Sequence, residues 1–290
     1  MSTILVTGAG GFIGRGMVEA LKQEHTVVAL YRSSVPADAA SVVPVRGDFT
    51  DKKTLNALAA YPIDKTLHLA AVTGRCEEAE GVRVNVYGTF LMLQQLIGQG
   101  CTKFVLAGSI AAVGLQRPAF RPLAFPVPDE HPCLDSKGYG FSKYMVEEVC
   151  RYFCRQNPEL DFLNLRCAAI FPDDKPVPLV ERGPAREWAL AGITRMTRRD
   201  IVRAYCLALD AEHRPGVRIL NAVSPKAWAT APTAELVRDW CGTAPGLEYY
   251  DEPGKAFAGV FACDAIQREL GFVARDLPEH FFPDAQKRRP

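Results

Sequence analysis

The sequence predicts an α/β fold built on a doubly wound parallel sheet, with a small α/β lid toward the C-terminus. Two observations predict it: strand and helix signals alternate along residues 1–170, and the strand segments are apolar throughout. Apolar strands within a strand-helix-strand repeat are typical of a parallel sheet that helices cover on both faces. Right-handed crossovers then wind such a sheet in two directions from its centre.

The predicted elements follow one another with short breaks. A first buried strand covers residues 3–6 and stops at Gly8, and apolar residues at helical spacing predict a helix over 12–24. Gly100 ends a helix over 86–99, and Asn157-Pro158 ends a long helix over 139–156. The other predicted strands are 26–30, 42–46, 66–70, 104–107, 162–166 and 218–221, and the other helices 51–60, 200–209, 233–241 and 264–270.

Two proline-rich stretches interrupt this alternation. Residues 117–132 contain five prolines, which predicts a semi-rigid irregular loop. Residues 171–199 also carry several prolines and few strand signals. We therefore divide the chain at residue 170, with the later part forming mostly a lid from which some segments return to the sheet.

Composition excludes several classes of protein. Thirty-four basic and 33 acidic side chains give a net charge of +1, which favours neither nucleic acid nor an anionic membrane as a partner. No apolar run approaches the roughly 18 residues of a membrane span, and the N-terminus does not resemble a signal peptide. Nine cysteines without a Cys-x-x-Cys pair predict reduced thiols in a cytoplasmic protein, with no metal site.

A glycine-rich turn follows the first strand, in the segment Thr7-Gly-Ala-Gly-Gly-Phe-Ile-Gly14. Gly8 permits a tight turn, Gly11 lets the backbone approach a pyrophosphate, and Gly14 allows the helix to pack closely on the sheet. The N-terminus of the helix offers N–H groups and a positive dipole end to phosphates. Because a strand precedes this turn and a helix follows it, we expect a dinucleotide there, in contact with Gly8, Gly11, Phe12, Ile13 and Gly14.

The ends of the next two strands suggest which dinucleotide binds. An acidic residue after the second strand would favour NAD, but the sequence there is Leu30-Tyr31-Arg32. Arg32 can pair with a 2′-phosphate, so it favours NADP over NAD, unless it is simply a solvated arginine. Asp48 can accept a hydrogen bond from adenine, with Phe49 beside the ring, or it can cap the following helix.

The sequence Tyr139-Gly-Phe-Ser-Lys143 carries the catalytic signal. Four residues apart on a helix, Tyr139 and Lys143 share a face. A phenol with a pKa of about 10 is a poor base at neutral pH, and a nearby ammonium lowers that pKa. The same lysine can bind the nicotinamide ribose. Ser109 comes just after the fifth strand, at the edge where such sheets bind ligands, and can polarise the substrate oxygen.

These motifs together resemble the extended short-chain dehydrogenases/reductases, which have a Rossmann fold, and within them the NAD-dependent epimerase/dehydratase group. The resemblance covers nearly the whole chain. It is carried by the glycine turn, Gly47-Asp48, His68-Leu-Ala-Ala71, Asn85-Val-Tyr-Gly-Thr89, Ser109, Tyr139-x-x-x-Lys143 and Leu165-Arg166.

The resemblance implies residues 1–170 as a dinucleotide-binding domain and 171–290 mostly as a substrate-binding lid. It also implies cofactor contacts at Leu69, Ala70, Ala71, Asn85, Lys143 and Ile170. A further implication is a homodimer in which the helices beginning near Asn85 and Tyr139 pack on their symmetry mates. Phe90, Leu93, Tyr144 and Phe153 can serve that interface, or they can belong to an ordinary helix–sheet core.

Three departures from the family pattern bear on the substrate. Ala169 stands where nucleotide-sugar epimerases usually present an asparagine, and residues 172–200 leave little chain to wrap a nucleotide diphosphate. Ser109 and Tyr139 are 30 residues apart, wider than usual. The Phe171-Pro172 pair and the compact lid resemble the uronate dehydrogenase branch, which oxidises a free sugar acid. Guanidinium groups for an acidic substrate are available at Arg75, Arg186, Arg195 and Arg199.

We therefore expect an NAD(P)-dependent oxidoreductase that transfers hydride to or from a sugar-like alcohol or carbonyl through Ser109, Tyr139 and Lys143. The main alternative is a nucleotide-sugar epimerase or dehydratase with tightly held NAD and no net redox change. A minor alternative is a non-catalytic dinucleotide sensor, which the Tyr139 and Lys143 pair disfavours.

Overall fold

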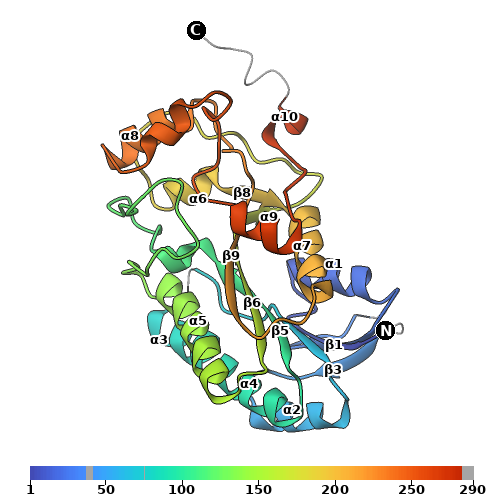
Figure 1. The fold of residues 1–290 in the computed structure, drawn as a ribbon. Helices are drawn as coiled ribbons and strands as arrows, with labels where there is room; N and C mark the ends of the chain where they lie inside the picture. The colour runs from blue at the N-terminus through green and yellow to red at the C-terminus, as the bar shows by residue number, and fades with distance from the viewer. Residues whose placement is uncertain (37–41, 75, 283–290) are drawn as a thin grey trace. The chain divides into compact units, whose positions relative to one another are not determined.

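The computed structural model describes residues 1–36, 42–74 and 76–282 (Figure 1). These residues form two compact units that interleave along the chain. The first unit comprises residues 1–108, 142–165 and 202–219, and the second comprises residues 109–141, 166–201 and 220 onward. The assignment of cofactor and substrate roles to the two halves of the chain stays a prediction.

The main sheet confirms the predicted fold class. Within the described residues it has seven strands in the order β3-β2-β1-β4-β5-β6-β9. The strands are β1 (Thr3–Thr7), β2 (Thr26–Tyr31), β3 (Val43–Arg46), β4 (Lys65–His68), β5 (Lys103–Ser109), β6 (Asp161–Cys167) and β9 (Gly216–Ala222). The chain runs outward from β1 to β3 and then crosses to β4, which pairs in parallel with β1. The crevice where ligands bind in such sheets therefore opens beyond β1 and β4.

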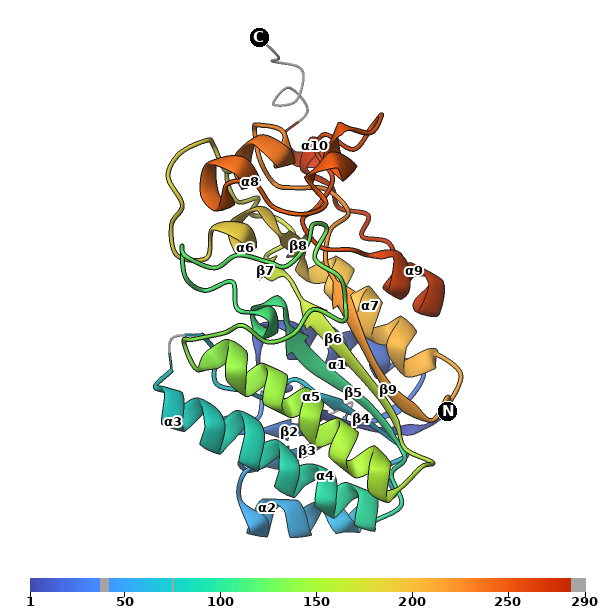
Figure 2. The same cartoon turned by 60° about the vertical axis from the view of Figure 1, so that its left-hand side comes forward.

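The helices cover both faces of this sheet. Helices α4 and α5 run side by side over one face, with the Phe90 and Phe153 rings 5.1 Å apart, and α1 lies on the other face (Figure 2). Leu5, Val28 and Phe104 belong to the apolar core beneath α4 and α5. The helix bounds are α1 (Phe12–Leu21), α2 (Lys52–Ala57), α3 (Glu78–Gly81), α4 (Thr89–Gly98), α5 (Tyr139–Gln156), α6 (Ala189–Ile193), α7 (Arg198–Asp210), α8 (Thr233–Cys241), α9 (Asp264–Leu270) and α10 (Pro278–Phe281).

The helix predicted to begin at Val86 in fact begins at Glu78. Helix α3 is followed by a π-helical segment, Val82–Gly88, which continues directly into α4. The first turn is acidic and largely exposed, so it has none of the apolar periodicity from which the prediction started. Gly81 lies inside this helical run, where a Cβ would make only ordinary contacts, 3.4 Å from Cys76 Sγ and 3.6 Å from the Ser142 hydroxyl of α5.

Charged side chains are buried where β5, β6 and β9 begin. The carboxylate of Asp161 is fully buried, contacts Arg218 at 2.5 Å and lies 3.6 Å from the ammonium of Lys103. Burial is the main cause that lowers the pKa of Lys103. Lys65 donates to the backbone oxygen of Leu209 at 2.9 Å, and Lys103 donates to that of Ala211. These two lysines satisfy carbonyl groups at the C-terminal end of α7, where positive charge is favoured.

The second unit contains a two-stranded parallel sheet that the sequence did not predict. β7 (Ala169–Phe171) pairs with β8 (Arg195–Thr197), and both strands are only three residues long. Strands this short are stabilised by their tertiary contacts. Three residues also carry too little sequence pattern for the strand to be predicted. The proline-rich stretch 117–132 has neither helix nor strand beyond one bridge at Val127, as predicted.

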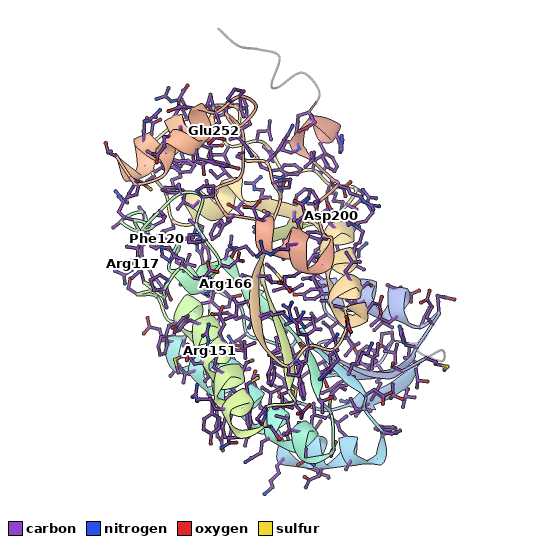
Figure 3. The ribbon with its side chains drawn as sticks, viewed as in Figure 1. Arg117, Phe120, Arg151, Arg166, Asp200 and Glu252 are labelled. Atoms are coloured by element: carbon purple, nitrogen blue, oxygen red, sulfur yellow. The ribbon has the colours of Figure 1, made fainter. Side chains whose placement is uncertain are left out.

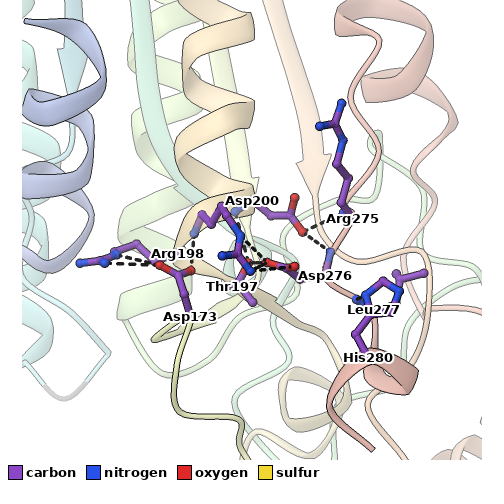
Figure 4. A network of polar contacts seen from close by, with 9 residues as sticks. Asp173, Thr197, Arg198, Asp200, Arg275, Asp276, Leu277 and His280 are labelled. Atoms are coloured by element: carbon purple, nitrogen blue, oxygen red, sulfur yellow. Dashed lines mark hydrogen bonds and ion pairs between the residues drawn. The ribbon is translucent and has the colours of Figure 1, made fainter. Parts of the chain in front are cut away.

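A polar network in the second unit joins the start of α7 to residues 275–280 (Figure 4). Arg199 binds the Asp276 carboxylate through two nitrogens at 2.9–3.1 Å. Asp200 is 1% exposed and accepts the backbone N–H groups of Arg275 and Asp276, each at 2.8 Å. Because the Arg199 guanidinium is bound by Asp276, the structure does not favour Arg199 as a ligand for an acidic substrate.

Metal-binding clusters and membrane-spanning helices are both absent from the part of the chain that the structure describes. Within the described residues, no cluster of three metal-binding side chains occurs. Among those same residues no helix is both long and apolar enough to cross a membrane. The nine cysteines are all free thiols, which agrees with the prediction of reduced cysteines, and a cytoplasmic location stays a prediction.

Candidate functional site

The glycine-rich turn after β1 has the close backbone contacts that its glycine spacing predicted. Gly8 has a φ of +68°, and a Cβ there would lie 2.9 Å from the backbone nitrogen of Ala70. A Cβ at Gly14 would overlap the backbone oxygen of Gly8. Gly11 stands at the N-terminus of α1 without a side-chain cap, and its N–H donates to Gly8 O at 2.9 Å. The turn therefore presents backbone, and no side chain, to any group lying over it.

A cavity of about 590 Å³ opens over this turn within the first unit. Its volume is in the usual range for a bound cofactor. Its walls come from the four segments that follow β1, β2, β3 and β4, and from α3 and the π-helical segment. Of the predicted cofactor contacts, the following line it: Gly8, Gly11, Arg32, Asp48, Phe49, Leu69, Ala70 and Ala71.

The cavity is lined by both basic and acidic side chains. Arg15, Arg32 and Arg83 line it together with two acidic residues, Asp48 and Glu80. Asp48 accepts hydrogen bonds from the backbone and hydroxyl of Thr50 at 2.9 and 2.8 Å. The cap of α2 is instead Asp51, which accepts from the backbone of Lys53. Asp48 is therefore not used as a helix cap, the alternative that the sequence left open.

Buried hydrogen bonds join β1, β4 and α4 beneath the cavity. The hydroxyl of Thr7 accepts the backbone N–H groups of Leu69 and Ala70, both at 3.2 Å, and lies 2.7 Å from Nδ1 of His68. A hydroxyl has two acceptor sites and one proton, so Thr7 donates that proton to Nδ1. Nε2 of His68 then carries the ring proton and donates to the Thr89 hydroxyl at 2.9 Å. This arrangement fixes the segment after β4 against the glycine turn.

The neutral state of His68 makes the stability of the chain depend on pH. Burial, and secondarily the charge of Lys143, lower the pKa of His68 to about 3. The unfolded imidazole has a pKa of about 6.5, so the stabilisation is complete above that pH and is lost as the pH falls toward 3. We expect the free energy of unfolding to fall by up to about 1.4 kcal/mol per pH unit through this group.

Urea unfolding at several pH values between 7.5 and 4.5 measures this loss. His68→Asn retains an amide for Thr7 and Thr89 but does not titrate, so its free energy of unfolding should depend less steeply on pH than that of the parent chain. Comparing the two chains cancels other groups, such as Asp129, whose pKa burial raises to about 6. If the free energies of unfolding of the two chains depended equally on pH, the assignment of this pH dependence to His68 would be wrong.

Asn85 is buried in the π-helical segment and does not line the cavity itself. Its side-chain oxygen accepts the backbone N–H of Val72 at 2.9 Å, and its nitrogen donates to Val72 O and to the Ser142 hydroxyl, both at 3.0 Å. The amide thus joins the loop after β4 to α5, one residue before Lys143. The role near the cofactor-binding loops that the resemblance implies for Asn85 stays a prediction.

Lys143 is held at the end of β5. It is 7% exposed, and its ammonium donates to the backbone oxygen of Ala107 at 2.9 Å. Ala107 stands two residues before Ser109 on the same strand. Tyr139 begins α5 and Lys143 comes one turn later, so both side chains leave the same face of the helix.

The start of α5 is fixed by a network that the sequence analysis missed. Asp135 accepts the Phe141 backbone N–H at 2.8 Å, and its other oxygen accepts from the Gln116 side chain at 2.9 Å. A Cβ at Gly140 would overlap the backbone oxygen of Ala111, in the turn that the Ser109 hydroxyl caps. Asp135 lies four residues before the predicted helix and not at its N-cap, so it carries no ordinary capping signal, and nothing in the sequence points to Gln116.

The remaining predicted residues do not line the cavity. Phe12 is 42% exposed, Gly14 is buried under the turn, and Ile170 lies in β7 of the second unit, paired with Met196. Ile13, Asn85 and Lys143 are also absent from its walls. The Arg166 side chain, labelled in Figure 3, is buried. It donates to Asp129 O at 2.8 Å.

The guanidinium groups considered for an acidic substrate differ in their surroundings. Arg75 lies outside the described residues, and Arg186 is exposed. Arg195 donates to the backbone oxygen of Pro178 at 2.8 Å, and burial lowers its pKa. Ala169 is exposed at the start of β7 and offers no amide.

Comparison with known proteins gives consistent results. The model of the NAD dependent epimerase/dehydratase family matches residues 4–177. UDP-glucose 4-epimerase of Erwinia amylovora is 27% identical over 181 residues, which cover 57% of this chain and 52% of that protein. UDP-glucose 4-epimerase 2 of Oryza sativa is 28% identical over 183 residues, 57% of this chain and 43% of that protein. The chain thus spans about half the length of the curated relatives it matches.

Solved structures share the fold over nearly the whole chain. A mutated uronate dehydrogenase superposes with a TM-score of 0.71 at 18% identity, covering 99% of this chain and 86% of that one. UDP-glucose 4-epimerase of Thermotoga maritima has a TM-score of 0.67 at 18% identity, covering 96% and 95%. An Agrobacterium tumefaciens short-chain dehydrogenase/reductase with bound NAD has a TM-score of 0.69 at 21% identity, covering 98% and 96%.

The family match covers more than half of the chain, and the structure has the fold and the glycine cradle that the sequence predicted. The family match also confirms the kind of cofactor that the sequence predicted, a nicotinamide dinucleotide. A preference for NADP stays a prediction. The chain belongs to the NAD-dependent epimerase/dehydratase family.

Proposed function

We propose that the protein is an NAD(P)-dependent oxidoreductase that transfers hydride to or from a sugar-like alcohol or carbonyl. The observation that carries the proposal is the pair Tyr139 and Lys143, one turn apart on α5, with Lys143 hydrogen-bonded to β5 two residues before Ser109. A binding protein without catalysis has no need of this pair, so the pair disfavours a dinucleotide sensor.

The residues present fit a dinucleotide, because the turn at Gly8 and Gly11 admits no side chain and the adjoining cavity is large enough for the adenosine half. When bound, the dinucleotide accepts or supplies hydride at its nicotinamide ring. Tyr139 takes the hydroxyl proton onto its phenolate oxygen during oxidation and returns it during reduction. The Lys143 ammonium stabilises the phenolate, and the Ser109 hydroxyl donates a hydrogen bond to the same substrate oxygen.

A panel of sugars with both cofactors tests this function. We expect NAD(P)H to accumulate, or to be consumed, in proportion to turnover with uronates or aldoses. Interconversion of UDP-sugars without any net change in NAD(P)H would instead establish the second candidate, a nucleotide-sugar epimerase. That candidate is favoured by the UDP-glucose 4-epimerases among the relatives and disfavoured by Ala169, which cannot make an amide contact.

Arg32 supports a preference for NADP. It follows β2 and lines the cavity together with Ser33, Ser34, Arg15 and Arg83, so hydroxyl and guanidinium groups that can bind a 2′-phosphate line the same cavity. We expect Arg32→Ala to raise the KM for NADP by about tenfold or more and to leave that for NAD within about twofold. Steady-state kinetics with both cofactors measure the change. Equal effects on NAD and NADP would show that Arg32 does not recognise the 2′-phosphate.

A homodimer through α4 and α5 is supported by exposed aromatic side chains on this helix layer. Tyr87 is 59% exposed and Tyr152 39%, whereas Leu93 and Phe153 are buried in the protomer's own core. Of the four residues predicted for the interface, these last two therefore belong to the core. We expect Tyr87→Glu to shift the molar mass from dimer to monomer in size-exclusion chromatography with light scattering. An unchanged mass, or a monomeric parent chain, would contradict this interface.

A further inference from the structure

Trp188 has a backbone conformation that its residue type disfavours. Its φ is +62° and its ψ +22°, and within the described residues it is the single non-glycine residue with a positive φ. Glycine and asparagine adopt this left-handed region with little strain, whereas a bulky side chain does not. Such strain persists where the surrounding structure holds the residue in place, and it gathers at functional sites.

The fold itself does not require tryptophan at this position. Trp188 stands at the N-terminus of α6 and makes no side-chain cap, although its backbone oxygen accepts from Gly192 at 2.8 Å. Asparagine would tolerate the conformation and could also cap the helix. The indole is only partly buried, whereas the rings of Trp228 and Trp240 are 0% and 5% exposed and belong to the core. Packing alone therefore gives no reason for a tryptophan here.

The indole lies beside the catalytic phenol. The rings of Trp188 and Tyr139 have centroids 6.4 Å apart, with an interplanar angle of 53°. The Trp188 backbone N–H donates to the backbone oxygen of Gln116, whose side chain binds Asp135, the residue that holds the start of α5. One hydrogen-bonded frame thus sets the positions of both Trp188 and Tyr139, all within the second unit.

We propose that Trp188 determines substrate specificity by packing its indole against the apolar C–H face of the sugar ring whose hydroxyl or carbonyl meets Tyr139. This inference rests on the proposed function, since it assumes a ring-shaped polyol at the phenol. Aromatic side chains in ligand pockets supply apolar contact area at low conformational cost, and a pyranose has one face made largely of C–H groups. A short open-chain alcohol lacks that face and gains nothing from the indole.

Two variants separate the ring from the backbone. Trp188→Asn keeps the left-handed conformation and removes the ring, and Trp188→Phe keeps an aromatic ring. With glucuronate, galacturonate, glucose and UDP-glucuronate as probes, we expect Trp188→Asn to raise the KM of the preferred sugar by about tenfold or more. The KM of NAD(P) and the thermal midpoint of the free chain should stay close to those of the parent. Trp188→Phe should recover most of the lost affinity.

Sugar binding is also read as a thermal shift in the presence of saturating cofactor, so the outcome does not depend on turnover. A sugar KM within about twofold of the parent in Trp188→Asn overturns the inference, as does a rise confined to the KM of NAD(P), which would place the indole against the nicotinamide instead. Absence of any shift with the four sugars in the parent chain also overturns it.

Failure of the proposed function gives a different pattern. If Tyr139→Phe retains full turnover while Trp188→Asn loses sugar binding, the assignment of Tyr139 fails and Trp188 still recognises the sugar. If Tyr139→Phe is inactive while Trp188→Asn behaves as the parent, the inference on Trp188 fails alone.

Discussion

Replacement of Tyr139 by phenylalanine is expected to lower kcat by about 10²- to 10⁴-fold, the usual contribution of a positioned acid or base. The phenol oxygen is the only atom lost, so helix α5, the Lys143 contact with Ala107 and the cavity beside Gly8 should be unchanged. The dissociation constant of NAD(P), measured by titration calorimetry, should therefore change by less than about threefold while turnover falls.

Tyr144→Phe is the matched control, because Tyr144 lies on the same helix, five residues after Tyr139 and one after Lys143. It loses the same atom, and we expect its kcat to remain near that of the parent. A Tyr139→Phe enzyme with near-normal turnover, or one no more impaired than the Tyr144→Phe enzyme, would remove Tyr139 from the mechanism.

Gly14→Ala is expected to abolish tight binding of the dinucleotide and to destabilise the first unit. The added Cβ would overlap Gly8 O and lie 2.9 Å from the Cα of Ala9, and both are backbone atoms that cannot rotate away. Either α1 moves from the sheet or the glycine turn opens, and overpacking of this kind costs about 1–3 kcal/mol of folding free energy. We expect the dissociation constant of NAD(P) to rise by about 100-fold or more, because the turn that approaches the pyrophosphate is displaced.

Gly98→Ala tests whether a glycine-to-alanine change is harmful in itself. Gly98 lies in α4, has no atom within 4 Å of its added Cβ and is not among the positive-φ glycines. Alanine is the better helix former by about 1 kcal/mol, so the thermal midpoint of the Gly98→Ala variant should stay the same as that of the parent chain or rise. If Gly14→Ala bound NAD(P) as tightly as Gly98→Ala, the cradle would not lie where the glycine turn places it.

Much of the fold was predictable because its signals are local. Most strands of the main sheet contain a short apolar run, and Tyr139 and Lys143 share a helix face by spacing alone. The spacing of Gly8, Gly11 and Gly14 predicts the glycine turn, because no other residue type allows one backbone segment to approach another, or a pyrophosphate, so closely. The failures have local reasons too. The exposed acidic turn of α3 has no apolar period, and β7 and β8 are too short to show one.

The sequence by itself determined the type of sheet, the glycine cradle and the pair on α5, since spacing within one element is enough to specify each. Only the tertiary structure decided which distant groups hold these parts in place. Thr7 meets His68 across 61 residues, and Asn85 meets Ser142 across 57. Such partners are chosen by the pairing of strands and the packing of helices, which bring side chains together regardless of their separation along the chain. The left-handed backbone of Trp188, beside Tyr139, is also decided by the tertiary structure. The surrounding residues hold it in a conformation that tryptophan itself disfavours.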